Sequence, residues 1–230
     1  CYGTTGPTSM PTGELATFGG DFPRVTIRDM VSLQKLVLDQ LGVQTLDLVI
    51  GGSMGGMQAL EWAIMHPEMV EVAIPIAVGA SQSAWAIGLS EAQRHAIVTD
   101  PAWKNGGYAP EAQPTDGLAT ARMMAMLSYR SAASFATRFG REEDDEGFSV
   151  QSYLRYQGEK LVDRFDANTY LTLLDAMDSH DVGRGRGPRE AILRRITAQV
   201  LAIGISTDVL YPVSEVRDMA RCIPGATFAV

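Results

Sequence analysis

The sequence has little of several features that would define its class at once. It contains only two cysteines, Cys1 and Cys222, so it predicts neither a disulfide framework nor a cysteine metal site, and it suits a reducing cytosol. No apolar run is long enough to cross a membrane. The 19 Lys and Arg residues are outnumbered by 27 Asp and Glu residues. The resulting net charge of −8 argues against a nucleic-acid partner and against an anionic membrane surface.

The sequence also lacks an initiator methionine and a signal peptide. It opens on a Gly- and Thr-rich stretch, 1–7, that is typical of a loop, and it closes on 226–230, which is typical of a strand cut in mid-run. We therefore expect a fragment that lacks material at both ends. Its 230 residues, 46% of them hydrophobic, suffice for one sizeable domain or for a domain that carries an insertion.

Helix and strand patterns alternate toward both ends of the chain, which predicts a mainly parallel sheet flanked by helices. The first helix is predicted from apolar residues at helical spacing, namely Met30, Leu33, Leu36, Val37 and Leu41. The predicted elements are a helix at 28–41, a strand at 45–51, a helix at 54–66, a strand at 70–78, a helix at 189–195, a strand at 198–205, a helix at 214–220 and a strand from 227.

Between 81 and about 185 the periodicity is helical, and no segment predicts a strand. The helical segments are 81–98, 116–129, 130–138, 149–163 and 167–178. The acidic tract 141–146 predicts a solvated surface turn. We interpret the region as a helical cap over the catalytic edge of the sheet. The expected domains are a core at 1–80, a helical lid at 81–187 and the second part of the core at 188–230.

The most specific motif is Gly51-Gly52-Ser53-Met54-Gly55, which lies between the strand at 45–51 and the helix at 54–66. A G-x-S-x-G sequence in this strand–turn–helix context is typical of a nucleophile elbow, in which a strained turn presents the serine hydroxyl. We expect side chains at positions 51 and 55 to collide with neighbouring backbone, which glycine avoids. The alternative is an ordinary glycine-rich turn.

A serine nucleophile needs a base and a carboxylate, which follow it along the chain in the order Ser, Asp or Glu, His in proteins with this elbow. Asp208 fits the second position because it follows the buried strand at 198–205; its alternative is a turn residue. The three histidines, His66, His95 and His180, all precede Asp208, so we expect the base beyond Val230. The backbone N–H of Met54 is predicted to form half of an oxyanion hole.

Several segments together resemble the homoserine O-acetyltransferase family, and the resemblance covers essentially the whole chain. The segments that carry it are Cys1–Pro7, Phe22–Met30, Gly51–Trp62, Ser128–Ser131, His180–Arg186 and Ser206–Pro212. The resemblance implies an α/β-hydrolase fold with an inserted helical lid, truncated at both termini. It implies acetyl transfer from acetyl-CoA to the hydroxyl of L-homoserine in methionine biosynthesis, with acetyl-CoA as co-substrate and no bound cofactor or metal.

The resemblance also implies roles for individual residues. Ser53 is the acylated nucleophile and Asp208 the triad acid, while Arg122 holds the homoserine carboxylate and Tyr129 lines the substrate pocket. Positions 122 and 129 are seven apart, so a helix would place both on one face. The catalytic histidine, and an aspartate after it, would follow Val230. A cytoplasmic homodimer formed through the lid helices is the implied assembly.

Other functions remain open at this point. The same fold and triad serve homoserine O-succinyltransferases and serine O-acyltransferases, carboxylesterases use the same nucleophile, and a non-catalytic binding module would retain the fold alone. The basic residues near 190 predict either a contact with coenzyme A phosphates or a solvated surface; they are Arg184, Arg186, Arg189, Arg194 and Arg195.

Overall fold

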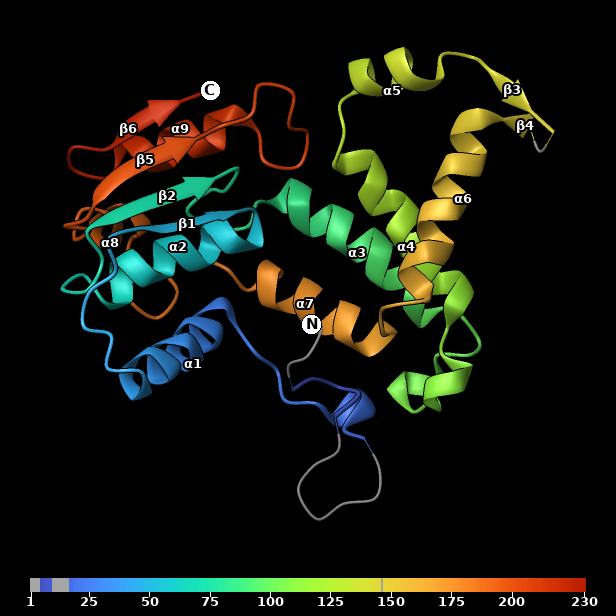
Figure 1. Ribbon diagram of the computed structural model, residues 1–230, viewed down its shortest axis with the longest axis horizontal. Coiled ribbons are helices and arrows are strands. Elements are labelled where there is room, and N and C mark those ends of the chain that lie inside the picture. The colour runs from blue at the N-terminus through green and yellow to red at the C-terminus, as the bar shows by residue number, and fades with distance from the viewer. Residues whose placement is uncertain (1–4, 10–16, 146) are drawn as a thin grey trace. The chain divides into compact units, whose positions relative to one another are not determined.

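The computed structural model describes residues 5–9, 17–145 and 147–230 (Figure 1). Contacts divide the chain into two compact units. The first, which we call the helical unit, comprises the residues up to Arg24 and Ile87–Asp175. The second, the sheet unit, comprises Val25–Ala86 and Ala176–Val230. The predicted division into core, lid and core uses other boundaries and stays a prediction.

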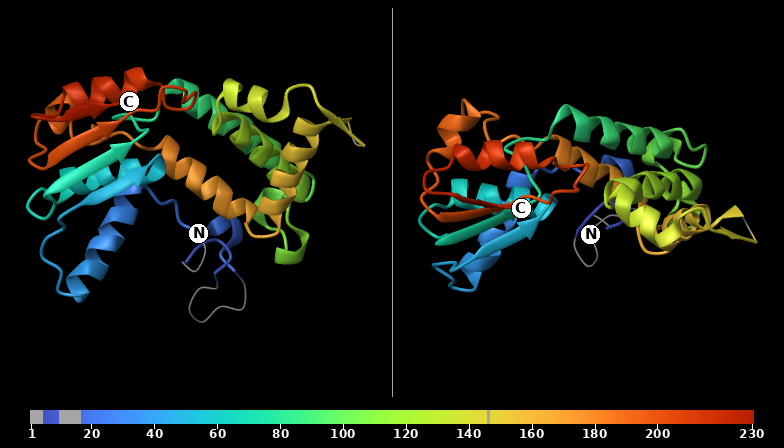
Figure 2. Two further views of the ribbon diagram at one scale, coloured as in Figure 1. Left: turned by 45° about the horizontal axis from the view of Figure 1, so that its top comes forward. Right: turned by 90° about the horizontal axis from the view of Figure 1, so that it is seen from above.

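The sheet unit is built on four parallel strands in the order β1-β2-β5-β6 (Figure 2). Their bounds are Val49–Gly52 for β1, Val72–Ile76 for β2, Gln199–Ile203 for β5 and Thr227–Ala229 for β6. Each of the three neighbouring pairs runs parallel. The predicted parallel sheet is therefore confirmed, with each strand found inside or within a residue of its predicted range.

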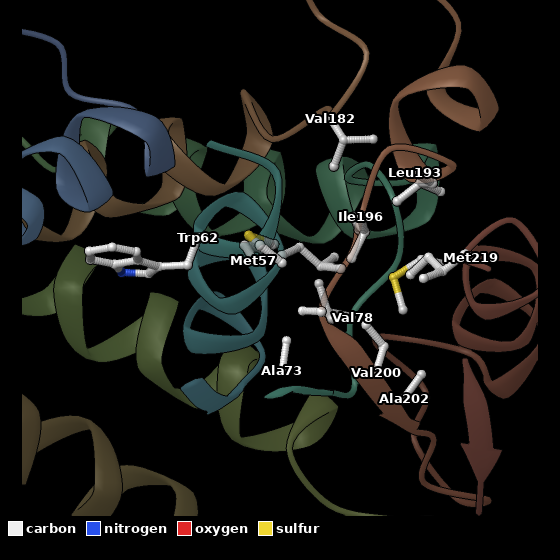
Figure 3. Packing of buried hydrophobic residues seen from close by; sticks show 14 of the residues in the cluster. Met57, Trp62, Ala73, Val78, Val182, Leu193, Ile196, Val200, Ala202 and Met219 are labelled. Atoms are coloured by element: carbon white, nitrogen blue, oxygen red, sulfur yellow. The ribbon is translucent and has the colours of Figure 1, made fainter. Parts of the chain in front are cut away.

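Four helices belong to this unit: α1 at Ile27–Gln40, α2 at Met54–Met65, α8 at Arg189–Leu193 and α9 at Val213–Arg221. The start of α1 is set by a capping box, in which Thr26 accepts the N–H of Asp29 and the Asp29 carboxylate accepts the N–H of Thr26. The core forms where helices meet the strands, and Figure 3 shows Met57 of α2, Val200 of β5 and Met219 of α9 within it.

Helix α1 is confirmed, yet most of the apolar residues that predicted it are exposed. Leu33, Leu36, Val37 and Leu41 are between 49% and 70% exposed, whereas Ile27 and Val31 are buried. Helical periodicity identifies an apolar stripe, but it does not show which residues of the stripe are buried against other elements. Among the described residues, Met30 and Leu38 also pack against the core, while the stripe formed by Leu33, Leu36 and Val37 stays exposed.

A buried ion-pair network joins α1, α2 and the loop 181–188. The carboxylate of Glu61, which is 1% exposed, accepts from Arg28 Nε at 3.0 Å and from Arg186 Nη1 at 2.7 Å. The Arg28 guanidinium also donates to the carbonyls of Asp181 and Arg184, each at 2.7 Å. The Glu61 carboxylate on α2 thereby holds α1 and the loop 181–188, which are distant from it in sequence.

The basic residues near 190 are partly used inside the chain. Arg186 pairs with Glu61, and Arg189 forms a two-point contact with Asp181 at 2.9 and 2.8 Å. This contact holds the pKa of Asp181 below its ordinary value. Arg186 and Arg189 therefore act as structural cations, a role that neither of the two interpretations of these residues predicts.

The helical unit contains α4 at Thr115–Ser128, α5 at Ala132–Phe139 and α6 at Ser149–Val162, while α3 at Ala84–Val98 and α7 at Ala167–Asp178 contribute residues to both units. All five predicted helices are confirmed. Helices α4 and α6 approach closely at Gly158, where a Cβ would lie 2.9 Å from the Ala119 carbonyl oxygen.

One expectation for the inserted region is wrong. Residues 141–145 of the acidic tract are exposed as predicted, but β3 within them, Glu143–Asp144, forms a short antiparallel ladder with β4, Gly147–Phe148. Strands of two residues are too short to show an alternating pattern, so the sequence could not indicate them.

Candidate active site

Ser53 occupies the single residue between the end of β1 and the start of α2. Its backbone angles, φ 53° and ψ −119°, lie in a region that residues other than glycine rarely adopt. The Ser53 N–H donates to the Ile76 carbonyl at 2.9 Å, and the Ser53 carbonyl accepts the Met57 N–H at 3.0 Å. The predicted strained turn is confirmed, while the nucleophile role of Ser53 stays a prediction.

The glycines of the motif do not act alike. A Cβ at Gly51 would overlap the backbone carbonyl of Gly55 and would lie 2.8 Å from the Gly55 Cα, as expected. A Cβ at Gly55 would meet nothing within 4 Å, so the expected collision at that position is wrong. A close approach that the motif does not predict occurs at Gly56, where a Cβ would lie 3.0 Å from the Ile76 carbonyl oxygen. Whether a Cβ would collide depends on the direction in which the Cα–H bond of each glycine points. The spacing of the glycines in the motif does not determine that direction.

Replacing Gly51 by alanine should destabilise the protein by about 3 kcal/mol, because backbone atoms cannot rotate away from the added methyl group. Gly55→Ala is the matched control, since it adds the same methyl group to open space and should change the free energy of unfolding by less than about 1 kcal/mol. Urea titrations of the two variants would measure the difference. Equal destabilisation of both would contradict this view of the turn.

Asp208 lies in the loop that follows β5, and its carboxylate has a defined orientation. Asp208 Oδ1 accepts the backbone N–H groups of Leu210 at 2.8 Å and Tyr211 at 2.9 Å. Because β1, β2 and β5 are adjacent and parallel, Ser53 and Asp208 come from the same edge of the sheet with one strand between their own. Two strand spacings amount to roughly 10 Å, which leaves room for an imidazole ring between a serine hydroxyl and a carboxylate.

Met54 is the first residue of α2. The N–H groups of a first helical turn have no intrahelical acceptor, and the helix dipole favours negative charge there. The Met54 N–H is therefore suited to a developing oxyanion beside Ser53, although the role itself stays a prediction.

Arg122 and Tyr129 lie in the helical unit, at the C-terminal part of α4 and at its C-cap. The Arg122 guanidinium carbon lies 5.5 Å from the centroid of the Tyr129 ring, so the two share one face as the spacing predicts. Arg122 Nε is buried and has no hydrogen-bond partner within the described part of the chain. An unsatisfied guanidinium donor of this kind is suited to a carboxylate.

Tyr170 of α7 belongs to the same cluster, and no motif in the sequence marks it. Burial raises the pKa of its phenol, Tyr129 raises it further, and the charge of Arg122 lowers it. Its hydroxyl donates to Gln93 Oε1 at 2.6 Å. A tyrosine 48 positions after Arg122 shares no periodicity with it, so only the packing of α4 and α7 could reveal the pair.

The three histidines occupy separate places. His66 is the C-cap of α2, His95 is exposed on α3, and His180 is 3% exposed in the sheet unit. His180 Nε2 lies 3.2 Å from the Gly79 carbonyl oxygen, so the neutral ring donates there. His180 thus connects the segment after β2 to the chain that leaves α7.

Burial lowers the pKa of His180 from its ordinary 6.5. The unfolded chain takes up a proton near pH 6.5 while the folded protein does not, so stability should be lost as pH falls below that value. We expect wild type to lose about 1 kcal/mol more than His180→Gln between pH 7 and 5.5. Urea unfolding at both pH values measures this, with His95→Gln as the exposed control. An identical pH dependence in wild type and His180→Gln would contradict the assignment.

Within the described ranges, no three His, Cys, Asp or Glu side chains are grouped so that they could hold a metal ion. In the same ranges, no helix is both long and apolar enough to cross a membrane. Cys222 is a free thiol, and Cys1 lies outside the described residues.

Comparison with known proteins identifies the fold family to which this geometry belongs. Residues 2–230 match the alpha/beta hydrolase fold family. The chain belongs to that family. The predicted fold class is therefore confirmed.

Individual relatives of this alpha/beta hydrolase chain carry two kinds of name. It is 53% identical over 228 residues to homoserine O-acetyltransferase of Trichormus variabilis, a match that covers 98% of this chain and 63% of that protein. The solved homoserine O-acetyltransferase from Bacillus anthracis superposes with a TM-score of 0.91 at 26% identity, covering 99% of this chain and 64% of the other. Esterase E22 superposes with a TM-score of 0.90 at 31% identity, covering 99% and 66%. The chain thus spans slightly less than two thirds of the length of each of these three proteins.

Proposed function

We propose that the full-length protein to which this chain belongs transfers an acetyl group from acetyl-CoA to the hydroxyl of L-homoserine through an acyl-serine at Ser53. The observation that carries the proposal is the strained backbone of Ser53 at the head of α2, in a chain 53% identical to a protein named homoserine O-acetyltransferase. The identity supports the substrate pair, and the backbone geometry supports a serine nucleophile.

The proposed reaction has two steps. In the first, a base that follows Asp208 in the whole protein takes the Ser53 proton, Ser53 Oγ attacks the thioester carbon, and coenzyme A leaves as its thiol with that proton. The oxyanion formed on the way is stabilised by the Met54 N–H. In the second, the homoserine hydroxyl gives its proton to the same base and attacks the acyl-serine, which releases O-acetylhomoserine and returns the proton to Ser53.

Substrate recognition is assigned to the helical unit. The Arg122 guanidinium is proposed to bind the homoserine carboxylate by two parallel hydrogen bonds, and Tyr129 to line the same pocket. Water must be excluded because hydrolysis of the acyl-serine competes with transfer. The proposed role of a helical lid at 81–187 is to exclude that water. We further propose a cytoplasmic homodimer that uses these helices and acts in methionine biosynthesis.

A second candidate function is ester hydrolysis, since the superposition with esterase E22 is as close as that with the acetyltransferase structure. Full-length protein separates the two. The proposal expects coenzyme A release from acetyl-CoA only when L-homoserine is present, with O-acetylhomoserine as product. Hydrolysis of p-nitrophenyl acetate at a higher kcat/KM, with no acetyl transfer to homoserine, would overturn it in favour of an esterase. Succinyl-CoA as donor and L-serine as acceptor are the other arms of the same assay.

A further inference from the structure

The loop that carries Asp208, residues 204–212 between β5 and α9, is held by a segment from elsewhere in the sheet unit. We call the loop the acid loop. Residues 82–85, which follow β2, make two hydrogen bonds with the acid loop and line a cavity together with the first turn of α9, and we call them the clamp segment. None of the clamp residues belongs to the predicted triad or to the substrate pocket.

The two hydrogen bonds join the clamp segment directly to the acid loop. The Tyr211 hydroxyl donates to Gln82 Oε1 at 3.2 Å, and both residues are buried, with 3% and 9% exposure. The Trp85 indole N–H donates to the Val209 carbonyl at 2.6 Å. The two acid-loop residues that are held, Val209 and Tyr211, follow Asp208 within three positions.

The clamp segment also lies beside α9, because Ser83 and Glu215 line the same cavity. Burial raises the pKa of Glu215, and the charge of Asp208 raises it further, so these two carboxyl groups are close enough to interact. The clamp segment, the acid loop and the start of α9 therefore form one packed group around Asp208.

These contacts bear on the orientation of the Asp208 carboxylate. Asp208 Oδ1 is held by the N–H groups of Leu210 and Tyr211. If the clamp holds Tyr211 and Val209 in place, those N–H groups stay fixed, and the carboxylate keeps its direction. Loss of the clamp would let the acid loop move and turn the carboxylate with it.

The clamp segment is itself anchored. The Gln82 N–H donates to the His180 carbonyl at 2.9 Å, and the Val182 N–H donates to the Ala80 carbonyl at 3.0 Å. With the His180 ring on the Gly79 carbonyl, three hydrogen bonds from residues 180–182 hold the chain at 79–82. It can therefore hold the acid loop in place rather than move with it.

The geometry points to Tyr211, Gln82 and Trp85 as positioning residues that hold the Asp208 carboxylate in the orientation in which it contacts the catalytic base. This inference rests on the Ser–Asp triad of the proposed function, but not on which acyl donor or acceptor is used. In a serine triad the carboxylate orients the imidazole and stabilises its protonated form. Loosening the clamp should therefore lower the rate of serine attack and lower the pKa of the base.

The test uses full-length protein and a fluorophosphonate probe. The probe reacts at Ser53 by forming an O–P bond and releasing fluoride, while the serine proton passes to the base, so no acyl donor is needed. Tyr211→Phe and Trp85→Phe remove one hydroxyl and one N–H donor respectively. We expect the labelling rate constant to fall about tenfold in each, because small misplacements of catalytic groups are costly. We also expect the acidic limb of the rate–pH profile to move to lower pH.

Two matched controls separate positioning from general loosening. Tyr108→Phe removes a phenol that donates to Asp166 Oδ1 at 2.6 Å in the helical unit. Trp62→Phe removes an indole N–H that donates to Gln34 Oε1 at 2.8 Å in the sheet unit. Both should leave the labelling rate within about twofold of wild type and the acidic limb unmoved, even if thermal stability falls as much as in the clamp variants.

The outcomes distinguish this inference from the proposed function. Clamp variants that label at the wild-type rate with an unmoved acidic limb would overturn the inference, as would controls that shift equally. A wild-type protein that labels at Ser53 but transfers no acetyl group to homoserine would refute the proposed function while the clamp variants still decide the inference. Failure of wild type to label at all would refute both.

Discussion

Full-length protein with Ser53 replaced by alanine is expected to lose acetyl transfer by about 10⁴-fold or more, because the covalent route through the serine no longer exists. The measurement is coenzyme A release from acetyl-CoA in the presence of L-homoserine, together with mass spectrometry for the acyl-enzyme. Ser53→Ala keeps a Cβ at φ 53°, so the strain of the turn remains and the fold should stay as stable as wild type.

Ser53→Gly is the matched variant, since glycine adopts this backbone conformation without strain. It should be as inactive as Ser53→Ala but more stable by about 1 kcal/mol. Transfer that survives in both variants would show that another group is acylated or that the acetyl group passes directly to homoserine. Equal stability of the two variants would show that the turn stores no strain.

Replacing Glu61 by glutamine is expected to reduce the free energy of unfolding by about 3–5 kcal/mol. The carboxylate is 1% exposed and pairs with both Arg28 and Arg186, so its removal leaves two partly buried guanidinium groups without their counter-charge. The loss should appear as a lower urea midpoint, with an unchanged dependence on denaturant if the folded state stays compact.

Glu91 provides the matched control for this prediction. It pairs with Arg94 at 2.6 Å, but its side chain is 64% exposed, and exposed ion pairs contribute less than about 1 kcal/mol. Glu91→Gln should therefore leave the urea midpoint almost unchanged. A Glu61→Gln variant no less stable than Glu91→Gln would show that the arginines find water or other acceptors at little cost.

Local patterns were sufficient for the elements and for the turn at Ser53. Helix α2 and strand β1 follow from apolar runs on either side of a glycine-rich motif, and the strained serine follows from that motif in that context. These features depend on residues within a few positions of one another, which periodicity and spacing describe directly. The same patterns could not show which face of α1 is covered, because Leu33 and Leu36 fit a helix equally well exposed or buried.

The amino-acid order alone therefore settled the α/β class, the boundaries of most helices and the place of Ser53 and Asp208 after two strands of the parallel sheet. Folding in three dimensions decided the pairing of Glu61 with Arg186, which are 125 positions apart, and of Tyr211 with Gln82, which are 129 apart. The physical reason is that local backbone preference acts over one or two turns, whereas burial brings together whichever distant groups the packed strands and helices place side by side.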